Sequence, residues 1–152
     1  MKRPAETSDE FLNLMVDWQS VETETIGYTK KEIPKTGNPL TRTILQALKL
    51  EAEKHCLIQQ MIVESVKKQA VNLSPEELTV LSNHLNRQMA VEEKNLSTAE
   101  QALEKSELFI SRYLLSYLIS DLKHQNELFR ELDDELKSAS IPTSATSKIF
   151  DS

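Results

Sequence analysis

The sequence has 152 residues, the length of one domain, and a chain of this size can bury enough surface to hold a core without staples. Only 2 Gly and 5 Pro occur and aromatic residues make up 5%, which argues against a many-turned β-sandwich or barrel. Charged residues make up 28%, and the abundance of Leu, Glu and Lys is typical of helices.

The net charge of −6 and the absence of a dense Lys/Arg stripe argue against nucleic-acid binding, which needs many cations to neutralise phosphates. The N-terminal residues lack the apolar stretch of a secretory signal, and no uncharged run is long enough to span a membrane. The single cysteine, Cys56, excludes a disulfide framework and a Cys-x-x-Cys metal knuckle. These features predict a soluble cytoplasmic protein that binds neither nucleic acid nor membrane.

The first predicted helix spans residues 8–32 and follows a disordered start, residues 1–7. Thr7 and Glu10 have the spacing of a capping box just before an apolar pair. Pro34 ends the helix, because proline disfavours the helical conformation in the residue before it.

Three more helices are predicted, over residues 39–70, 75–105 and 107–138, followed by a flexible tail, residues 139–152. An Asn-Pro pair starts the first of these, since proline is tolerated at the first helical position. Ser74, followed by Pro and then Glu at the third helical position, is a strong start signal for the next. A Ser-Glu pair is expected to cap the last.

No strand pattern occurs, and four amphipathic helices bury their apolar stripes by packing on one another. The predicted fold is therefore an all-α antiparallel four-helix bundle over residues 8–138, built from two similar helical hairpins. The link between the second and third helices leaves two topologies open: a crossover along the bundle, or a simple up-and-down arrangement.

Ionisable residues interrupt the middle of each predicted apolar row, at positions where a core residue is expected. The rows of the second and fourth helices, spaced 4, 3, 4, 3, 4, are Ile44, Leu48, Glu51, His55, Ile58, Ile62 and Ile110, Leu114, Tyr117, Asp121, His124, Leu128. The rows of the first and third helices are Met15, Trp18, Glu22, Ile26, Thr29, Ile33 and Leu81, Leu85, Met89, Glu92, Leu96, Ala99, Leu103.

Four carboxylates and two histidines at one level of a bundle core need a common partner, because an unpaired buried charge is very unfavourable. Carboxylate oxygens and imidazole nitrogens are natural ligands of divalent transition metals. The predicted ligands are Glu22, Glu51, His55, Glu92, Asp121 and His124. An internal repeat agrees with this set, since 33 residues separate Glu22 from His55 and 32 separate Glu92 from His124.

These residues resemble the ferritin-like superfamily, specifically small rubrerythrin-like and bacterioferritin-like four-helix proteins, over about residues 10–136. The resemblance rests on Glu22 before an Asn-Pro helix start, the run Glu51-Ala-Glu-Lys-His55, Glu92, and Asp121-Leu-Lys-His124. It implies a centre of two iron ions, or of manganese or a mixed pair. Glu22 and Glu92 would then be single ligands, and the two acid–His pairs would complete the centre.

The sequence departs from the family pattern at two positions. Ala52 stands where the family has the acid three residues before the histidine, and Asp121 replaces the commoner Glu. A mononuclear, altered or lost site is therefore an open alternative. The Cys-rich domain of rubrerythrins has no counterpart here.

The resemblance implies a redox role of ferroxidase or peroxidase type, with O₂ or peroxide as the reacting partner, in a homo-oligomer such as a dimer. The alternative is a metal-free ferritin-like bundle that acts as a dimerisation or adaptor module. A metalloprotease is disfavoured, since no His-Glu-x-x-His run occurs.

Overall fold

The computed structural model describes residues 4–67 and 73–139, and the side chains within 9–67 and 73–138. Every regular element in these ranges is helical, which confirms the all-α class. The elements are α1 (Pro4–Glu32), a short 3-10 turn η1 (Ile33–Lys35), α2 (Pro39–Lys67), α3 (Pro75–Lys105) and α4 (Phe109–Ala139). The predicted tail lies outside the described residues except for Ala139, and the first three residues of the predicted disordered start lie outside them too.

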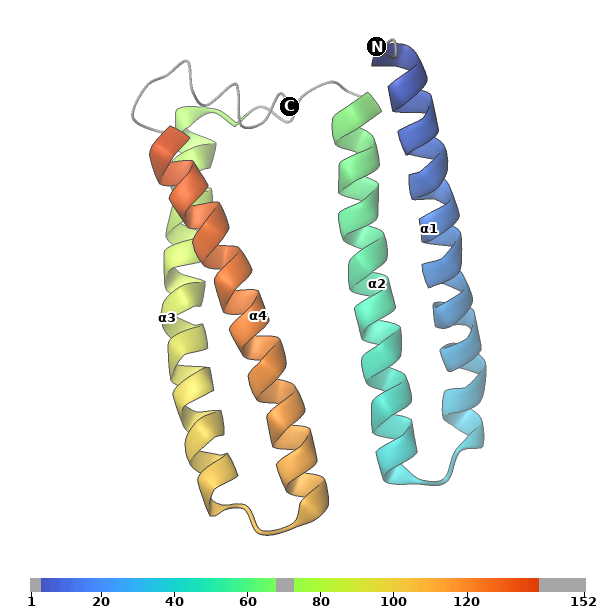
Figure 1. Cartoon of the computed structure of the whole chain (residues 1–152), viewed down its shortest axis with the longest axis vertical. Helices are drawn as coiled ribbons and strands as arrows, with labels where there is room; N and C mark the ends of the chain where they lie inside the picture. The colour runs from blue at the N-terminus through green and yellow to red at the C-terminus, as the bar shows by residue number, and fades with distance from the viewer. Residues whose placement is uncertain (1–3, 68–72, 140–152) are drawn as a thin grey trace. The chain divides into compact units, whose positions relative to one another are not determined.

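The four helices pack in pairs, as Figure 1 shows: α1 lies along α2, and α3 lies along α4. The two pairs belong to two compact units, Met1–Val71 and Asn72–Ser152. We call α1 with α2 the first pair and α3 with α4 the second pair. Each pair is described by itself.

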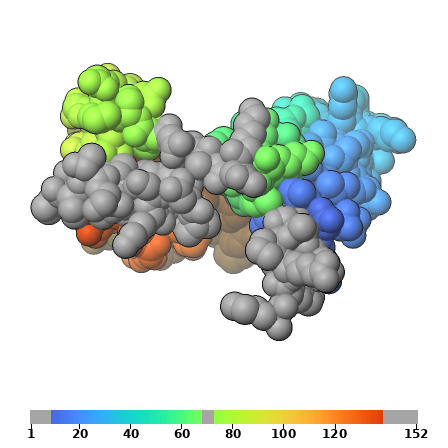
Figure 2. Space-filling model, turned by 90° about the horizontal axis from the view of Figure 1, so that it is seen from above, coloured from blue at the N-terminus to red at the C-terminus, as the bar shows by residue number. Residues whose placement is uncertain are grey.

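The chain runs in opposite directions along the two helices of the first pair. Gln19 donates a hydrogen bond to Gln60 at 3.1 Å, and Glu22 contacts His55 at 3.0 Å, so the partner's number falls as the residue number rises. Figure 2 looks down on the helix ends and shows α1 and α2 in direct contact. The short η1 turn is what allows this reversal.

The second pair has the same antiparallel direction and the clearest apolar cluster. Ion pairs Glu93–Arg130 and Glu100–Lys123 join its helices at 3.3 and 3.7 Å. The cluster lies toward the α3 N-terminus and comprises Leu78, Leu85 and Leu136, packed against Leu73, Leu81 and Phe129.

Helix boundaries follow the start signals in two places and depart from them in two others. Ser74 forms a full capping box with Glu77, and Asn38 accepts a hydrogen bond from the Thr41 backbone N–H at 3.0 Å, as their sequence contexts predict. Thr7 lies inside α1 and does not begin it. The Ser-Glu pair at 106–107 does not begin α4, because Ser106 instead caps the C-terminal end of α3.

A heptad-spaced line of buried and half-buried residues marks where each helix meets its partner, and we call these lines contact rows. In the first pair they are Leu12, Met15, Gln19, Glu22, Ile26, Thr29, Ile33 on α1 and Leu45, Lys49, Ala52, Cys56, Gln59, Val63, Val66 on α2. In the second pair they are Ser82, Leu85, Met89, Glu92, Leu96, Ala99, Leu103 on α3 and Leu115, Ile119, Leu122, Asn126, Phe129, Asp133, Leu136 on α4.

The row predicted for α3 agrees with its contact row from Leu85 onward; at its start the contact row has Ser82 in place of Leu81. The rows predicted for α2 and α4 differ from the contact rows. The predicted α2 row lies one residue before the α2 contact row at every position. On α4, Asp121 lies one residue before Leu122, and His124 lies two residues before Asn126. On α1 the prediction fails at Trp18, which is 52% exposed and whose neighbour Gln19 holds the contact position. The reason is that several of these helices carry apolar residues on two faces, so helical period alone did not select the covered one.

We call the line one residue before a contact row the side row; one residue turns about 100° around the helix. In an antiparallel pair, both side rows lie on the same side of the pair. Together they form the first-pair side face, whose apolar members are Phe11, Leu14, Trp18, Val21, Tyr28, Ile44, Leu48, Ile58 and Ile62.

Candidate functional site

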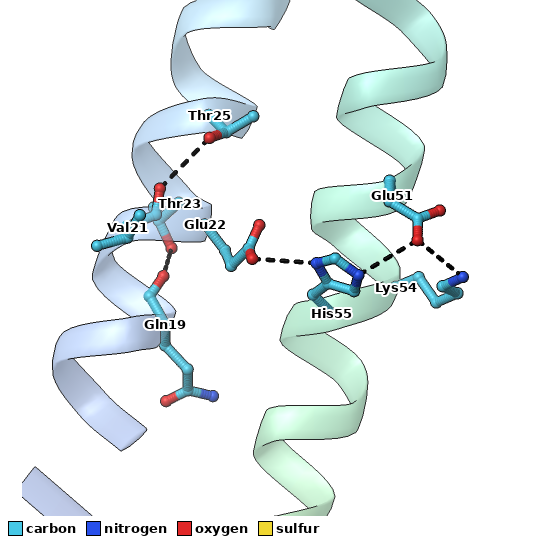
Figure 3. A network of polar contacts seen from close by, with 8 residues as sticks. All are labelled: Gln19, Val21, Glu22, Thr23, Thr25, Glu51, Lys54 and His55. Carbon is cyan, nitrogen blue, oxygen red and sulfur yellow. Dashed lines mark hydrogen bonds and ion pairs between the residues drawn. The ribbon is translucent and has the colours of Figure 1, made fainter. Parts of the chain in front are cut away.

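The polar site that the structure brings together lies in the first pair, where His55 contacts two carboxylates. Its Nδ1 lies 3.0 Å from Glu22 Oε1 on α1, and its Nε2 lies 3.2 Å from Glu51 Oε1 on its own helix. Lys54 Nζ lies 3.0 Å from the same Glu51 oxygen. Figure 3 shows this chain of contacts running from α1 across to the outer side of α2.

Helix geometry explains why these residues meet. Glu51 and His55 are four residues apart, so they lie one above the other on one face of α2. Glu22 belongs to the α1 contact row and lies between α1 and α2. Its side chain is only 15% exposed, against 43% for Glu51. His55 lies at the edge of that boundary, where its ring reaches the buried acid.

Each acid of the site lies beside a basic group. When both carboxylates are ionised, both histidine contacts are hydrogen bonds only if each ring nitrogen carries a proton and donates. The hydrogen bond from Lys54 holds the pKa of the Glu51 carboxyl below its ordinary value; the charges of Lys54 and His55 and the His55 hydrogen bond add to this, while partial burial opposes it. Two acids thus face two basic groups.

The second pair does not reproduce this arrangement from its three predicted ligands. Glu92 is buried in the contact row, where one oxygen accepts a hydrogen bond from Gln88 at 2.9 Å and the other, Oε2, has no partner. Asp121 and His124 are exposed and lie off that row. No hydrogen bond or ion pair joins either of them to Glu92 among the described residues.

A 70-residue repeat relates the two pairs and corrects the equivalence expected from the sequence. Every contact-row position recurs 70 residues later, which matches Glu22 with Glu92 and Glu51 with Asp121. The same offset matches His55 with Gln125, whereas the acid–histidine spacing in the sequence predicts that His55 corresponds to His124. The acid is therefore repeated and the histidine is not.

The joints between the helices repeat with the same offset. Arg42 donates to the Thr36 carbonyl at 2.9 Å, and Arg112 donates to the Ser106 carbonyl at 2.9 Å. The backbone N–H of each arginine also donates to the residue four before it, opening α2 and α4 respectively. The repeat is thus present in contacts as well as in burial.

The six predicted metal ligands come from both pairs, so the centre that they would form stays a prediction. Within one pair the side chains do not make a metal site. The two imidazole nitrogens point away from each other, so a metal on one of them would meet Glu22 or Glu51 but not both. Among the residues that the structure describes, no group of three or more His, Cys, Asp or Glu side chains could hold a metal ion.

Sequence reasoning missed three buried polar residues. Gln59 is 2% exposed and neither amide atom has a hydrogen-bond partner; Asn126 and Asp133 each bury one unpartnered oxygen. All three lie on contact rows, and the 70-residue offset between the pairs was the signal that could have placed them there. Such groups reduce the stability of an isolated pair.

Comparison with family models, with curated proteins and with solved structures finds no match for this chain. Within the described residues, no helix combines the length and the apolar character needed to cross a membrane. The ferritin-like resemblance therefore stays a prediction from the residues that carry it.

Proposed function

We propose that this protein is a helical interaction module, whose helix pairs bind further helices through their apolar side faces. The observation that carries the proposal is the first-pair side face. Its nine apolar residues include Trp18 and Ile58, which are 52% and 53% exposed. A face that exposes so many large apolar side chains is a mark of an interaction site, and Glu51 and His55 are the polar groups at its centre.

The energetics of a single pair support this function. The buried apolar residues of the first pair are only Met15, Ala52 and Val63 among the described side chains, and they share the boundary with the unpartnered Gln59. Two helices bury one stripe each, which is rarely enough for independent stability. Covering the side face with more helices would supply the missing burial. The ferritin-like four-helix bundle predicted from the sequence is one arrangement that does so.

The single tryptophan offers a direct test. Because Trp18 lies on the side face, a covered face predicts emission blue-shifted from that of the unfolded protein and slow quenching by acrylamide. Ile58→Glu places a charge on the same face at about the level of Trp18 and should shift the emission to the red. Leu57→Glu, on the opposite side of α2, should leave it unchanged. Rapidly quenched, red-shifted emission from the native protein would contradict the proposal.

A di-metal redox protein is the second candidate, favoured by the 3.0 Å contact between Glu22 and His55 across the two helices. In that proposal the six predicted ligands would hold two iron, manganese or mixed ions, and such a centre would supply redox chemistry toward O₂ or peroxide. The residues described within each pair do not build that site, so no step of a reaction is derived from it.

Metal content decides between the two candidates. We expect the purified protein, after incubation with Fe(II), Mn(II) or Zn(II) and desalting, to retain less than one ion per chain by elemental analysis. About two ions per chain, lost in His55→Ala and kept in the matched His84→Ala, would instead establish the metal centre. His84 is an exposed histidine outside the predicted set, which makes it a fair control.

A further inference from the structure

The apolar character of the first-pair side face is not matched in the second pair. The α4 side row keeps it, with Leu114, Leu118, Leu128 and Leu132 at the positions of Ile44, Leu48, Ile58 and Ile62. The α3 side row keeps it only in part: Leu81 and Val91 follow Phe11 and Val21 by 70 residues, but His84, Gln88 and Thr98 follow Leu14, Trp18 and Tyr28. The best-matched cover for the first-pair side face is a face that is equally apolar on both helices, and among the described residues another first pair provides it.

Charge complementarity fixes the direction in which two such faces would meet. The α2 side row is symmetric about position 53, with Glu51 and His55 on either side of it and aliphatic residues beyond. A parallel copy would set Glu51 against the partner's Glu51 and leave the histidines together. An antiparallel copy sets Glu51 against His55 of the partner subunit, and the reverse contact follows from the twofold axis.

The same register matches the apolar residues. With position 53 on the axis, Leu48 lies level with Ile58 of the partner subunit, and Ile44 lies level with Ile62 of the partner subunit. The polar groups at the centre would be buried already paired, because His55 contacts Glu22 and Glu51, and Lys54 contacts Glu51, within each copy. Buried charges that are paired and hydrogen-bonded are the tolerated kind.

We propose that the partner of the first-pair side face is a second copy of this chain, bound through antiparallel α2 helices about a twofold axis at position 53. The inference rests on the proposed function and names its partner. It makes the side face a homodimer interface in which the acid–histidine positions at mid-helix set the register.

The mass of the 152-residue protein in solution is the first test, measured by sedimentation equilibrium over a range of concentrations. We expect a dimer. A charge buried against an apolar residue strongly disfavours the interface, so Ile58→Glu should raise the dissociation constant by on the order of tenfold or more. Leu57→Glu is the matched control: it adds the same charge to the same helix, at a residue 74% exposed on the opposite side, and should leave the dimer intact.

Disulfide cross-linking tests the register without depending on affinity. In a Cys56→Ser background, the Leu48→Cys/Ile58→Cys double variant should form a covalent dimer under mild oxidation. Leu48→Cys alone should not form one, because the two copies of position 48 would lie about 15 Å apart along the direction of the α2 helices. The Leu50→Cys/Leu57→Cys variant carries its thiols on the opposite face and should also stay uncrosslinked.

The outcomes separate this inference from the proposed function. A monomer whose Trp18 is shielded would overturn the dimer and leave the interaction module in place, with its cover supplied from elsewhere. A monomer with an exposed Trp18 would overturn both. A dimer whose dissociation constant is unchanged by Ile58→Glu would overturn the α2 interface. So would a dimer that cross-links through positions 50 and 57 as readily as through positions 48 and 58.

Discussion

The polar residues on the contact rows divide by whether they have a partner. Glu22 gains His55 and through it Glu51, whereas Glu92 buries an oxygen with no donor. A buried oxygen without a donor destabilises the fold by about 1–3 kcal/mol, while a formed hydrogen bond contributes about 1 kcal/mol. The unpartnered Oε2 of Glu92 therefore lowers the stability of its pair although Oε1 accepts from Gln88, whereas the equivalent Glu22 has a partner across the two helices.

Glu51→Gln tests the contribution of the outer part of this chain of contacts. Because the pKa of the Glu51 carboxyl lies below its ordinary value of 4.5 in the folded protein, its stabilising effect exists above that value and is lost as the pH falls through the folded pKa. We expect Glu51→Gln to lower the free energy of unfolding by about 0.2–1 kcal/mol at pH 7, the range of exposed ion pairs. At pH 3 the difference from the native protein should be smaller than at pH 7.

Urea denaturation of both proteins at pH 7 and pH 3 makes this measurement. Glu24→Gln is the control, since it removes the same charge from an exposed position on α1. A destabilisation by Glu51→Gln that is equal at the two pH values would show that the carboxylate's charge is not its cause.

At the scale of the helices, the sequence predicted elements better than faces. The Ser74 capping box and the Asn-Pro helix start could be predicted because capping depends on a few adjacent residues. Ile44 beside Leu45 and Leu114 beside Leu115 are adjacent aliphatic pairs, and either member fits a heptad row. Which one is covered is decided by the partner helix, and a single sequence does not carry that information.

The candidate site was predicted in part for the same reason. Glu22, Glu51 and His55 meet because the acid–histidine pair is one turn long and the link between α1 and α2 is short, so spacing along the chain determines the contact. Asp121 and His124 also have one-turn spacing. Asp121 holds the position equivalent to Glu51, but His124 stands one residue before position 125, the equivalent of His55, and no hydrogen bond or ion pair joins it to Glu92 among the described residues.

Across the chain, the 70-residue repeat allows a residue of one pair to be introduced at the equivalent position of the other. Gln125→His would place a histidine where His55 stands in the first pair, facing the equivalents of Glu22 and Glu51, namely Glu92 and Asp121. We expect the variant to raise the free energy of unfolding by about 1 kcal/mol, because the unpartnered Glu92 oxygen would gain a donor.

Thermal or urea denaturation monitored by circular dichroism measures this gain. Ser120→His adds a histidine to an exposed position of the same helix and should give no comparable gain. An equal increase in both variants would mean that the equivalence of positions 55 and 125 does not extend to their contacts with the buried acid.

The paired arginine joints have a consequence for the history of this chain. Arg42 and Arg112 each donate to the carbonyl six residues before them, as tandem duplication of one ancestral helix pair would leave them. After such an event each half can change separately wherever the other half still performs the task. The two halves of this chain differ beside the buried acid, where position 55 is a histidine and position 125 a glutamine, and on the side rows, where His84 and Gln88 stand in place of Leu14 and Trp18. A duplicated scaffold of this kind keeps its joints while its faces take on different partners.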